Sequence, residues 1–138
     1  MDKVVDQNIE MIAKDGVELC YIVRAEFEPT STTFITQPEY KQQVGFIKYD
    51  AGGVIARHTH VPLERRLTGT SEVVLVRRGS CQLEVYTDDR ELVATRDVGP
   101  GDLILMISGG HGFNVREDTV LLEVKQGPYT GLEEKERF

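Results

Sequence analysis

Short apolar runs separated by turn residues dominate the chain from about residue 17 onward. The runs are rich in Val, Ile, Leu, Tyr and Phe, and they are too short and too often interrupted for helices, so the pattern predicts strands. Gly, Pro, Asp and Asn between the runs are typical of turns. The predicted strands cover residues 17–27, 44–50, 54–60, 72–78, 81–87, 91–98, 102–107, 111–116 and 119–126. Strands at this regular spacing indicate an all-β fold, with antiparallel sheets packed as a sandwich or small barrel.

The two ends of the chain are less regular. Residues 1 to about 15 lack the strand pattern, and we expect a short helix or a loose arm there. Residues 29–43 fit either a loop or an edge strand that leaves the main fold to join a partner. A chain of 138 residues with 40% hydrophobic residues can form one core by itself, so one domain is expected. The expected division is a single domain 1–138, with its core at about 44–127, an N-terminal arm with extra strands at 1–43, and a C-terminal tail at 128–138.

Two of the three histidines lie on one face of the predicted strand 54–60. Side chains on a strand alternate, so His58 and His60 project from the same face, about 6 to 7 Å apart along the chain. The same alternation is expected to place Val54 and Ala56 beside them on the inside. The spacing therefore indicates a chelating pair.

A carboxylate and a third histidine occupy the ends of later strands. Glu72 shares its strand face with Val74 and Val76, and an interior carboxylate needs a partner because an unpaired buried charge costs at least several kcal/mol. His111 is the third histidine, at the start of "HGFNV". Imidazole nitrogens and a carboxylate oxygen suit Fe(II), Mn(II), Ni(II), Co(II) or Zn(II). His58, His60, Glu72 and His111 are therefore the predicted ligands of one divalent metal ion.

At these residues the sequence resembles the cupin superfamily, whose members are small β-barrels of the jelly-roll type. Gly52, His58 and His60 fit the opening of the first cupin motif, and Glu72 followed by six residues and Gly79 fits its close. The second motif is represented by "PGDLILMISGGHGFN", which has Gly101, Gly109 and His111 at motif positions and Ile107 in place of the proline. The resemblance covers about residues 44–127 and implies a cupin-type jelly-roll β-barrel of antiparallel strands.

The chain departs from the first motif in the spacing of its glutamate. Eleven residues separate His60 from Glu72, whereas Glu64 falls at the short spacing of the family. We favour Glu72 as the ligand because it begins an alternating strand that ends in a glycine turn, a setting that holds a ligand still. The insertion Val61–Ser71 is then expected to be a loop beside the metal that shapes substrate access.

The resemblance implies a metal-dependent enzyme that acts on a small polar molecule, such as a sugar derivative, by Lewis-acid or iron-centred chemistry. An isomerase or epimerase and a dioxygenase are the reaction classes considered, because the fold alone does not give the reaction. Two alternatives stay open: a non-catalytic module that binds a metal and a small ligand, and a structural metal site. Cupins of this size resemble half of a two-barrel unit, so a homodimer is expected.

Further polar residues are candidates for catalysis or substrate binding. Arg65 and Arg66, in the insertion, could bind an anionic group of the substrate, and they fit a solvated loop equally well. Val120, Leu122 and Val124 are the expected core face of the last strand, which would turn Glu123 and Lys125 outward; facing inward, these two would be an acid/base pair. The full set of catalytic candidates is Glu64, Arg65, Arg66, Glu123, Lys125 and Tyr129, with Tyr49 as a second phenol at the rim.

Charge and composition limit the partners. The formal net charge is −7 and the basic residues form no run longer than two, which argues against nucleic acid as a partner. Acidic residues interrupt the apolar positions at the N-terminus, and no apolar run is long enough to span a membrane, so we expect a cytoplasmic protein. Cys20 and Cys81 are accordingly expected to be reduced.

Overall fold

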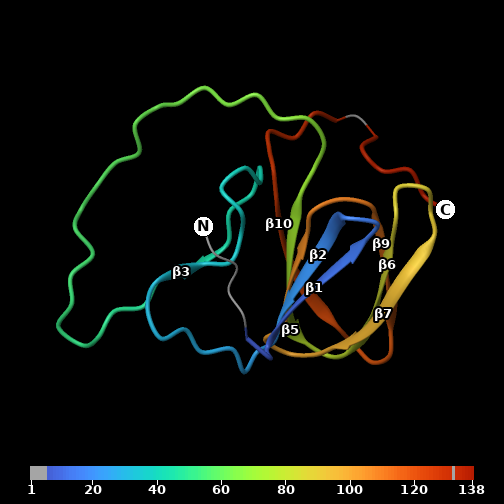
Figure 1. The fold of residues 1–138 in the computed structure, drawn as a ribbon, viewed down its shortest axis with the longest axis horizontal. Coiled ribbons are helices and arrows are strands. Elements are labelled where there is room, and N and C mark those ends of the chain that lie inside the picture. The colour runs from blue at the N-terminus through green and yellow to red at the C-terminus, as the bar shows by residue number, and fades with distance from the viewer. Residues whose placement is uncertain (1–5, 132) are drawn as a thin grey trace.

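Every regular element that the structure describes is a β-strand. The structure is a computed structural model, and it describes residues 6–131 and 133–138 (Figure 1). The strands are β1 Ile9–Lys14, β2 Val17–Val23, β3 Thr33–Phe34, β4 Gly45–Phe46, β5 Glu72–Arg78, β6 Cys81–Tyr86, β7 Leu92–Val98, β8 Leu103–Met106, β9 Gly110–Val115 and β10 Val120–Lys125. Within these ranges, no helix has the length and apolarity needed to cross a membrane.

The strands form three antiparallel sheets. The largest has the order β1-β2-β8-β5-β10, a second has the order β7-β6-β9, and β3 pairs with β4 in a short ribbon. The predicted all-β class and antiparallel pairing are therefore confirmed. The described residues do not close into a barrel: the two larger sheets pack face to face.

The core lies between these two sheets and follows the alternation of the strands. Ile22, Ile104 and Val76 come from the five-stranded sheet, and Leu83 and Val85 come from the three-stranded one; all five side chains are almost completely buried. Cys20 and Cys81 belong to the same cluster and are unpaired thiols, as expected. Burial raises the pKa of Cys20 to about 12, so the thiol stays protonated.

Seven of the predicted strands are confirmed within about four residues: the strand predicted at 17–27 becomes β2, and the last six become β5 to β10. The prediction for the N-terminal region is wrong where it can be tested, because residues 9–14 form β1 rather than a helix or loose arm. The predicted strand 54–60 is also wrong, since these residues have no regular structure and no sheet partner. Of the predicted strand 44–50, Gly45–Phe46 pairs with β3.

The β1–β2 hairpin explains the missed strand. Asp15 and Gly16 both have positive φ, 51° and 79°, which is the geometry of a two-residue turn between antiparallel strands. Asp-Gly flanked by alternating apolar residues is the sequence signal for such a hairpin. This signal was not used in the prediction of a short helix or loose arm for this region.

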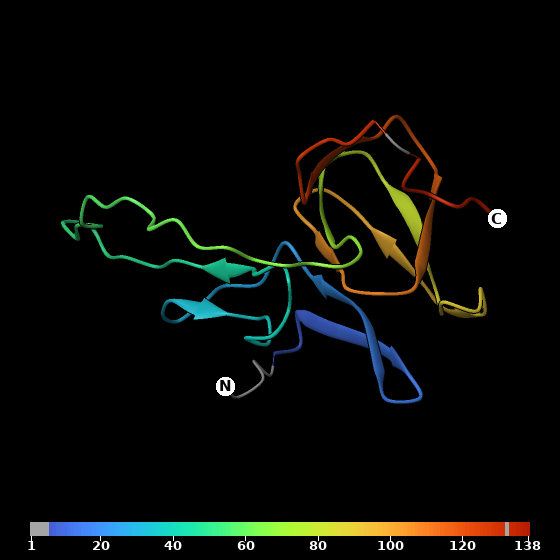
Figure 2. The same cartoon turned by 90° about the horizontal axis from the view of Figure 1, so that it is seen from above.

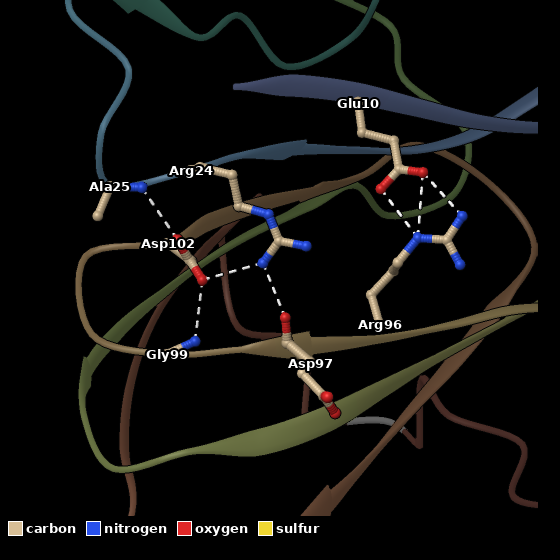
Figure 3. Close-up of polar contacts among 7 residues, drawn as sticks. All are labelled: Glu10, Arg24, Ala25, Arg96, Asp97, Gly99 and Asp102. Atoms are coloured by element: carbon tan, nitrogen blue, oxygen red, sulfur yellow. Dashed lines mark hydrogen bonds and ion pairs between the residues drawn. The ribbon is translucent and has the colours of Figure 1, made fainter. Parts of the chain in front are cut away.

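An ion pair connects the edge strands β1 and β7 of the two sheets (Figure 3). Arg96 on β7 donates through Nε to Glu10 on β1 at 2.9 Å, and through Nη2 at 2.7 Å. This bidentate hydrogen bond lowers the pKa of Glu10, against the opposing effect of partial burial. The β1 edge of one sheet is thus joined to the β7 edge of the other.

Asp102, in the turn before β8, joins three segments of the chain at the same side (Figure 3). Its carboxylate accepts hydrogen bonds from the backbone N–H of Ala25 and of Gly99, each at 2.9 Å, and from Arg24 Nη1 at 3.1 Å. The same Arg24 nitrogen donates to the backbone carbonyl of Asp97 at 2.7 Å. These contacts satisfy a largely buried carboxylate.

The segment between β4 and β5 leaves the body of the molecule. Residues 47–70, which we call the β4–β5 arm, are all exposed, and the chain runs away from both large sheets before it returns to β5 (Figure 1). The view from above shows the same arm reaching far from the sheets (Figure 2). At its base, Lys41 Nζ donates to the carbonyl of Thr68 at 2.6 Å, and the backbone N–H of Lys48 donates to Thr32 Oγ1 at 3.1 Å.

Candidate metal centre

Glu72 and His111 face each other inside the gap between the two sheets. Glu72 begins β5, and its strand face carries the buried Val74 and Val76, so the predicted inward face of this strand is confirmed. His111 lies on β9, with Nε2 3.9 Å from Glu72 Oε1. Only 12% of the Glu72 side chain and 27% of the His111 side chain are exposed. A carboxylate and an imidazole thus meet where the two sheets come together.

A second carboxylate contacts Glu72. Burial raises the pKa of Glu72 to about 7, with further contributions from a hydrogen bond and the negative charge of Glu123. The pKa of Glu123 is lowered by the same hydrogen bond. The two carboxyl groups therefore share one proton near neutral pH, which is the behaviour of carboxylates held close together. Burial lowers the pKa of His111, and the nearby Lys135 adds to this, so the imidazole is neutral and able to bind a metal.

The expected orientation of β10 is wrong. Leu121 packs against the core, and the alternation then turns Glu123 and Lys125 to the same inner side. Leu122 and Val124 face outward and are 47% and 51% exposed. Lys125 Nζ lies 3.9 Å from Glu123 Oε2, so an ammonium group stands beside the carboxyl pair.

A pocket of about 660 Å³ opens at Glu72 and His111. Its walls include Glu72, His111 and Met106, and the C-terminal residues 134–138 form another side. Phe138 holds this tail in place, because its ring packs against Tyr86 with 5.0 Å between centroids. The sequence predicts only a C-terminal tail at 128–138, since nothing in the strand pattern indicates that it folds back onto the sheets.

The other two predicted ligands lie on the β4–β5 arm. His58 and His60 are exposed, with 5.3 Å between their ring centroids, a separation at which one ion can bind both imidazoles. Nδ1 of His58 lies 2.8 Å from the carbonyl oxygen of Ala56, so this nitrogen donates the hydrogen bond and leaves Nε2 as the atom that would face a metal. Ala56 and Val54 are exposed rather than inside as expected.

The described part of one chain thus separates the predicted ligands into two pairs. It contains no group of three or more His, Cys, Asp or Glu side chains close enough to hold one metal ion. No family model, curated protein sequence or solved structure matches this chain. The donor types suit a divalent metal, whereas their positions within one chain do not bring all four together.

The remaining candidates are spread over the surface. Glu64 and Arg66 pair with each other on the arm, with 3.5 Å between Arg66 Nε and Glu64 Oε1, and both side chains are more than four-fifths exposed. Arg65 is exposed beside them, and Tyr49 and Tyr129 are exposed as well. The end of the insertion Val61–Ser71 lies beside the site, because Gly69 and Thr70 line the same pocket as Glu72 and His111, whereas its earlier residues belong to the arm that extends away from the sheets (Figure 2).

Proposed function

We propose that this chain is a metal-dependent enzyme of the cupin kind that acts on a small polar molecule, such as a sugar derivative. The observation that carries the proposal is the facing pair Glu72 and His111 at an open pocket. These two residues come from the two cupin-like motifs, which lie far apart in the sequence. Their meeting agrees with what the resemblance implies for this half of the ligand set and supports the proposal.

We propose that the two facing sheets form a jelly roll. A jelly roll has eight strands in two facing sheets. Along the part of the chain that the structure describes, β9 pairs only with β6 and β10 only with β5, so each ends its sheet. The two facing sheets together supply eight strands. The segment 54–60, which has a strand-like sequence and no sheet partner in the described chain, is a natural neighbour for one of these edges.

His58, His60, Glu72 and His111 are the residues that would hold the ion. An ion with these four ligands keeps open coordination positions and supplies Lewis acidity for a hydroxyl or carbonyl group, or redox chemistry with O2 if it is iron. Glu123 and Lys125 are the candidates for proton transfer, because both are turned to the inner side beside Glu72. A carboxylate with a lowered pKa is ionised at neutral pH and can accept a proton.

The pocket and its polar groups favour an enzyme over the two alternatives. A purely structural metal site is closed, whereas Glu72 and His111 line a pocket of about 660 Å³. A module that only binds its ligand needs no fixed acid and base, whereas Glu123 is hydrogen-bonded to the pocket residue Glu72 and lies 3.9 Å from Lys125.

Metal analysis of natively purified protein is the first test. We expect about one divalent ion per chain, and Glu72→Gln should lower this content tenfold or more because a ligand is lost. Glu64→Gln is the matched control on the arm and should leave the content nearly unchanged. The reverse result would give the ligand role to Glu64, and a metal-free wild-type protein would refute the proposal.

Turnover separates the enzyme from the binding module. With the native metal restored, substrate classes such as sugars and their acids are screened for conversion by the wild-type protein. Glu123→Gln should then reduce kcat by a factor of about 100 or more, as expected for loss of a general base, while the metal stays bound. Binding of a substrate class without any conversion would favour the non-catalytic module.

A further inference from the structure

The four predicted metal ligands are divided between two parts of the molecule. His58 and His60 lie on the β4–β5 arm, and Glu72 and His111 lie at the pocket between the sheets. Each part carries two donors, which is half of the set that the proposed site needs. A complete site therefore requires an arrangement that brings the two pairs of donors together.

The side of the sandwich next to the pocket has two strand edges without a paired strand in the described part of the chain, and the C-terminal residues 134–138 lie beside the pocket. The β1 and β7 edges are joined by Glu10 and Arg96, whereas β9 and β10 each lack a second neighbour among residues 6–131 and 133–138. An unpaired strand edge presents free N–H and C=O groups and readily accepts another strand. His111 lies on β9 itself, so a strand added to this edge would run beside it.

The arm has the composition of a strand that lacks its sheet. Val54 and Val61 are 79% and 76% exposed, and Ile55 and Leu63 are exposed by more than half. Four large apolar side chains exposed on one short segment are what an interaction site presents. The turn at Asp50–Gly53, closed by a 3.0 Å hydrogen bond, separates residues 54–60 from the start of the arm as an independent extended segment.

The base of the arm directs it away from its own sheets. Lys41 and Thr68 are bonded at 2.6 Å, and Thr32 and Lys48 at 3.1 Å, so both ends of the arm are tied to the β3–β4 ribbon (Figure 2). A second copy of the chain presents the same free β9 edge and carries the same arm. Two copies related by a twofold axis can therefore fill each other's edges, which is a self-complementary interface.

The charges of the arm and of the pocket support a second copy of the chain as the partner of the β9 edge. Between residues 54 and 67 the arm has three arginines and one glutamate, so it is basic. The pocket is acidic, because its walls hold four glutamates against one lysine and one arginine, namely Glu72, Glu84, Glu134, Glu136, Lys135 and Arg137. Opposite charges on the two surfaces favour their association.

We propose that the β4–β5 arm is exchanged between two copies of this chain and that each metal site is completed in trans. Residues 54–60 of one copy lie along β9 of the other and bring His58 and His60 to its Glu72 and His111. The trans site rests on the proposed metal-dependent function, whereas the exchange of the arm stands on the free edges and the exposed apolar residues. A dimer is then required for metal binding, and not only for stability.

Mixed dimers test the trans site through zinc content. One chain carries His58→Ala and His60→Ala, the other carries Glu72→Gln and His111→Ala, and dimers that contain one of each are isolated by two different affinity tags after joint refolding in zinc. Exchange predicts one zinc ion per mixed dimer, half of the wild-type content, although each variant alone binds less than a tenth. A mixed dimer without zinc would overturn the trans site.

The reciprocal pairing is the matched control. Here all four substitutions are on one chain and the other chain is wild type. Sites completed in trans predict less than a tenth of the wild-type zinc in this dimer, because each site has lost one of its halves. Sites within one chain predict one zinc ion per dimer. The two pairings therefore give opposite results for the two arrangements, and one zinc ion here would refute the exchange.

Hydrogen exchange tests the arm without a metal. In the wild-type dimer, the amides of residues 54–60 should be protected at least tenfold more strongly than after dilution to the monomer. Protection that does not change on dilution would mean that the arm folds onto its own chain, and an absence of protection in the dimer would mean that the arm stays free. Either result overturns the exchange. Wild-type protein that binds no zinc would refute the proposed function alone, and the exchange would still be decided by this measurement.

Discussion

Asp102→Ala should destabilise the protein by about 3 to 4 kcal/mol, because it removes a buried carboxylate that joins three segments. The side chain is 10% exposed and accepts hydrogen bonds from Ala25 and Gly99 at 2.9 Å and from Arg24 at 3.1 Å. Hydrogen bonds to a charged group contribute about 1.5 to 3 kcal/mol each. The three hydrogen bonds of Asp102 could therefore contribute more to the unfolding free energy than the loss that we expect. Arg24 is 29% exposed and keeps its bond to the carbonyl of Asp97, so water and this carbonyl offset part of the cost.

Asp97→Ala is the matched control for this prediction. The Asp97 side chain is 72% exposed and pairs with Arg116 at 2.8 Å, so its loss should cost no more than about 1 kcal/mol. The backbone carbonyl that binds Arg24 is retained in this variant. Urea unfolding of both variants gives the difference, and equal slopes with urea concentration confirm that the same amount of surface unfolds. If Asp102→Ala cost less than 1 kcal/mol, the buried network would not hold these segments together.

Two further predictions concern the ion pair between the sheets and a glycine turn near the pocket. The hydrogen bond with Arg96 lowers the pKa of Glu10, so the contribution of this carboxylate to stability is complete above its unfolded pKa, near 4.5, and is lost as the pH falls through the folded pKa. The unfolding free energy of Glu10→Gln, measured by urea unfolding between pH 6 and 3, should therefore fall less steeply with decreasing pH than that of the wild type. Parallel curves for the two proteins would contradict the assignment. Gly109 has a φ of +76° and a Cβ there would lie 2.2 Å from the carbonyl oxygen of Tyr86, whereas Gly16, with a φ of +79°, has no atom within 4 Å of such a Cβ. Thermal unfolding should show that Gly109→Ala costs at least about 2 kcal/mol and Gly16→Ala about 1 kcal/mol, because only the first adds a steric clash to the strain of positive φ; equal losses would mean that the turn at residue 109 adapts freely.

The strands β5 to β10 could be predicted from the sequence because their information is local. Apolar alternation gives the strand, and the Gly, Asp and Pro residues between strands give the turns. The alternation also predicted that Glu72 shares an inner face with Val74 and Val76, as the structure has it. The same local logic would have found β1, since Asp15-Gly16 is a hairpin signal in the sequence.

The orientation of β10 could not be obtained in this way. Both of its faces carry apolar side chains, Leu121 on one and Leu122 and Val124 on the other, so the sequence offers two possible inner faces. The choice depends on the partner strand, because the register with β5 places Glu123 opposite Val74 and turns both toward the core. An edge strand with one open side tolerates the exposed apolar residues that result.

The sequence alone determined the residue types of the candidate site, the strands that carry Glu72, Glu123 and His111, and the all-β class, because these depend on neighbours along the chain. Only the tertiary structure decided which strands lie side by side, since alternation defines the faces of a strand but not its partner. Tertiary structure therefore brought Glu72, Glu123 and His111 together from three strands. It also extended residues 47–70 away from the sheets, because a segment with a strand-like sequence becomes a strand only where an edge is within its reach.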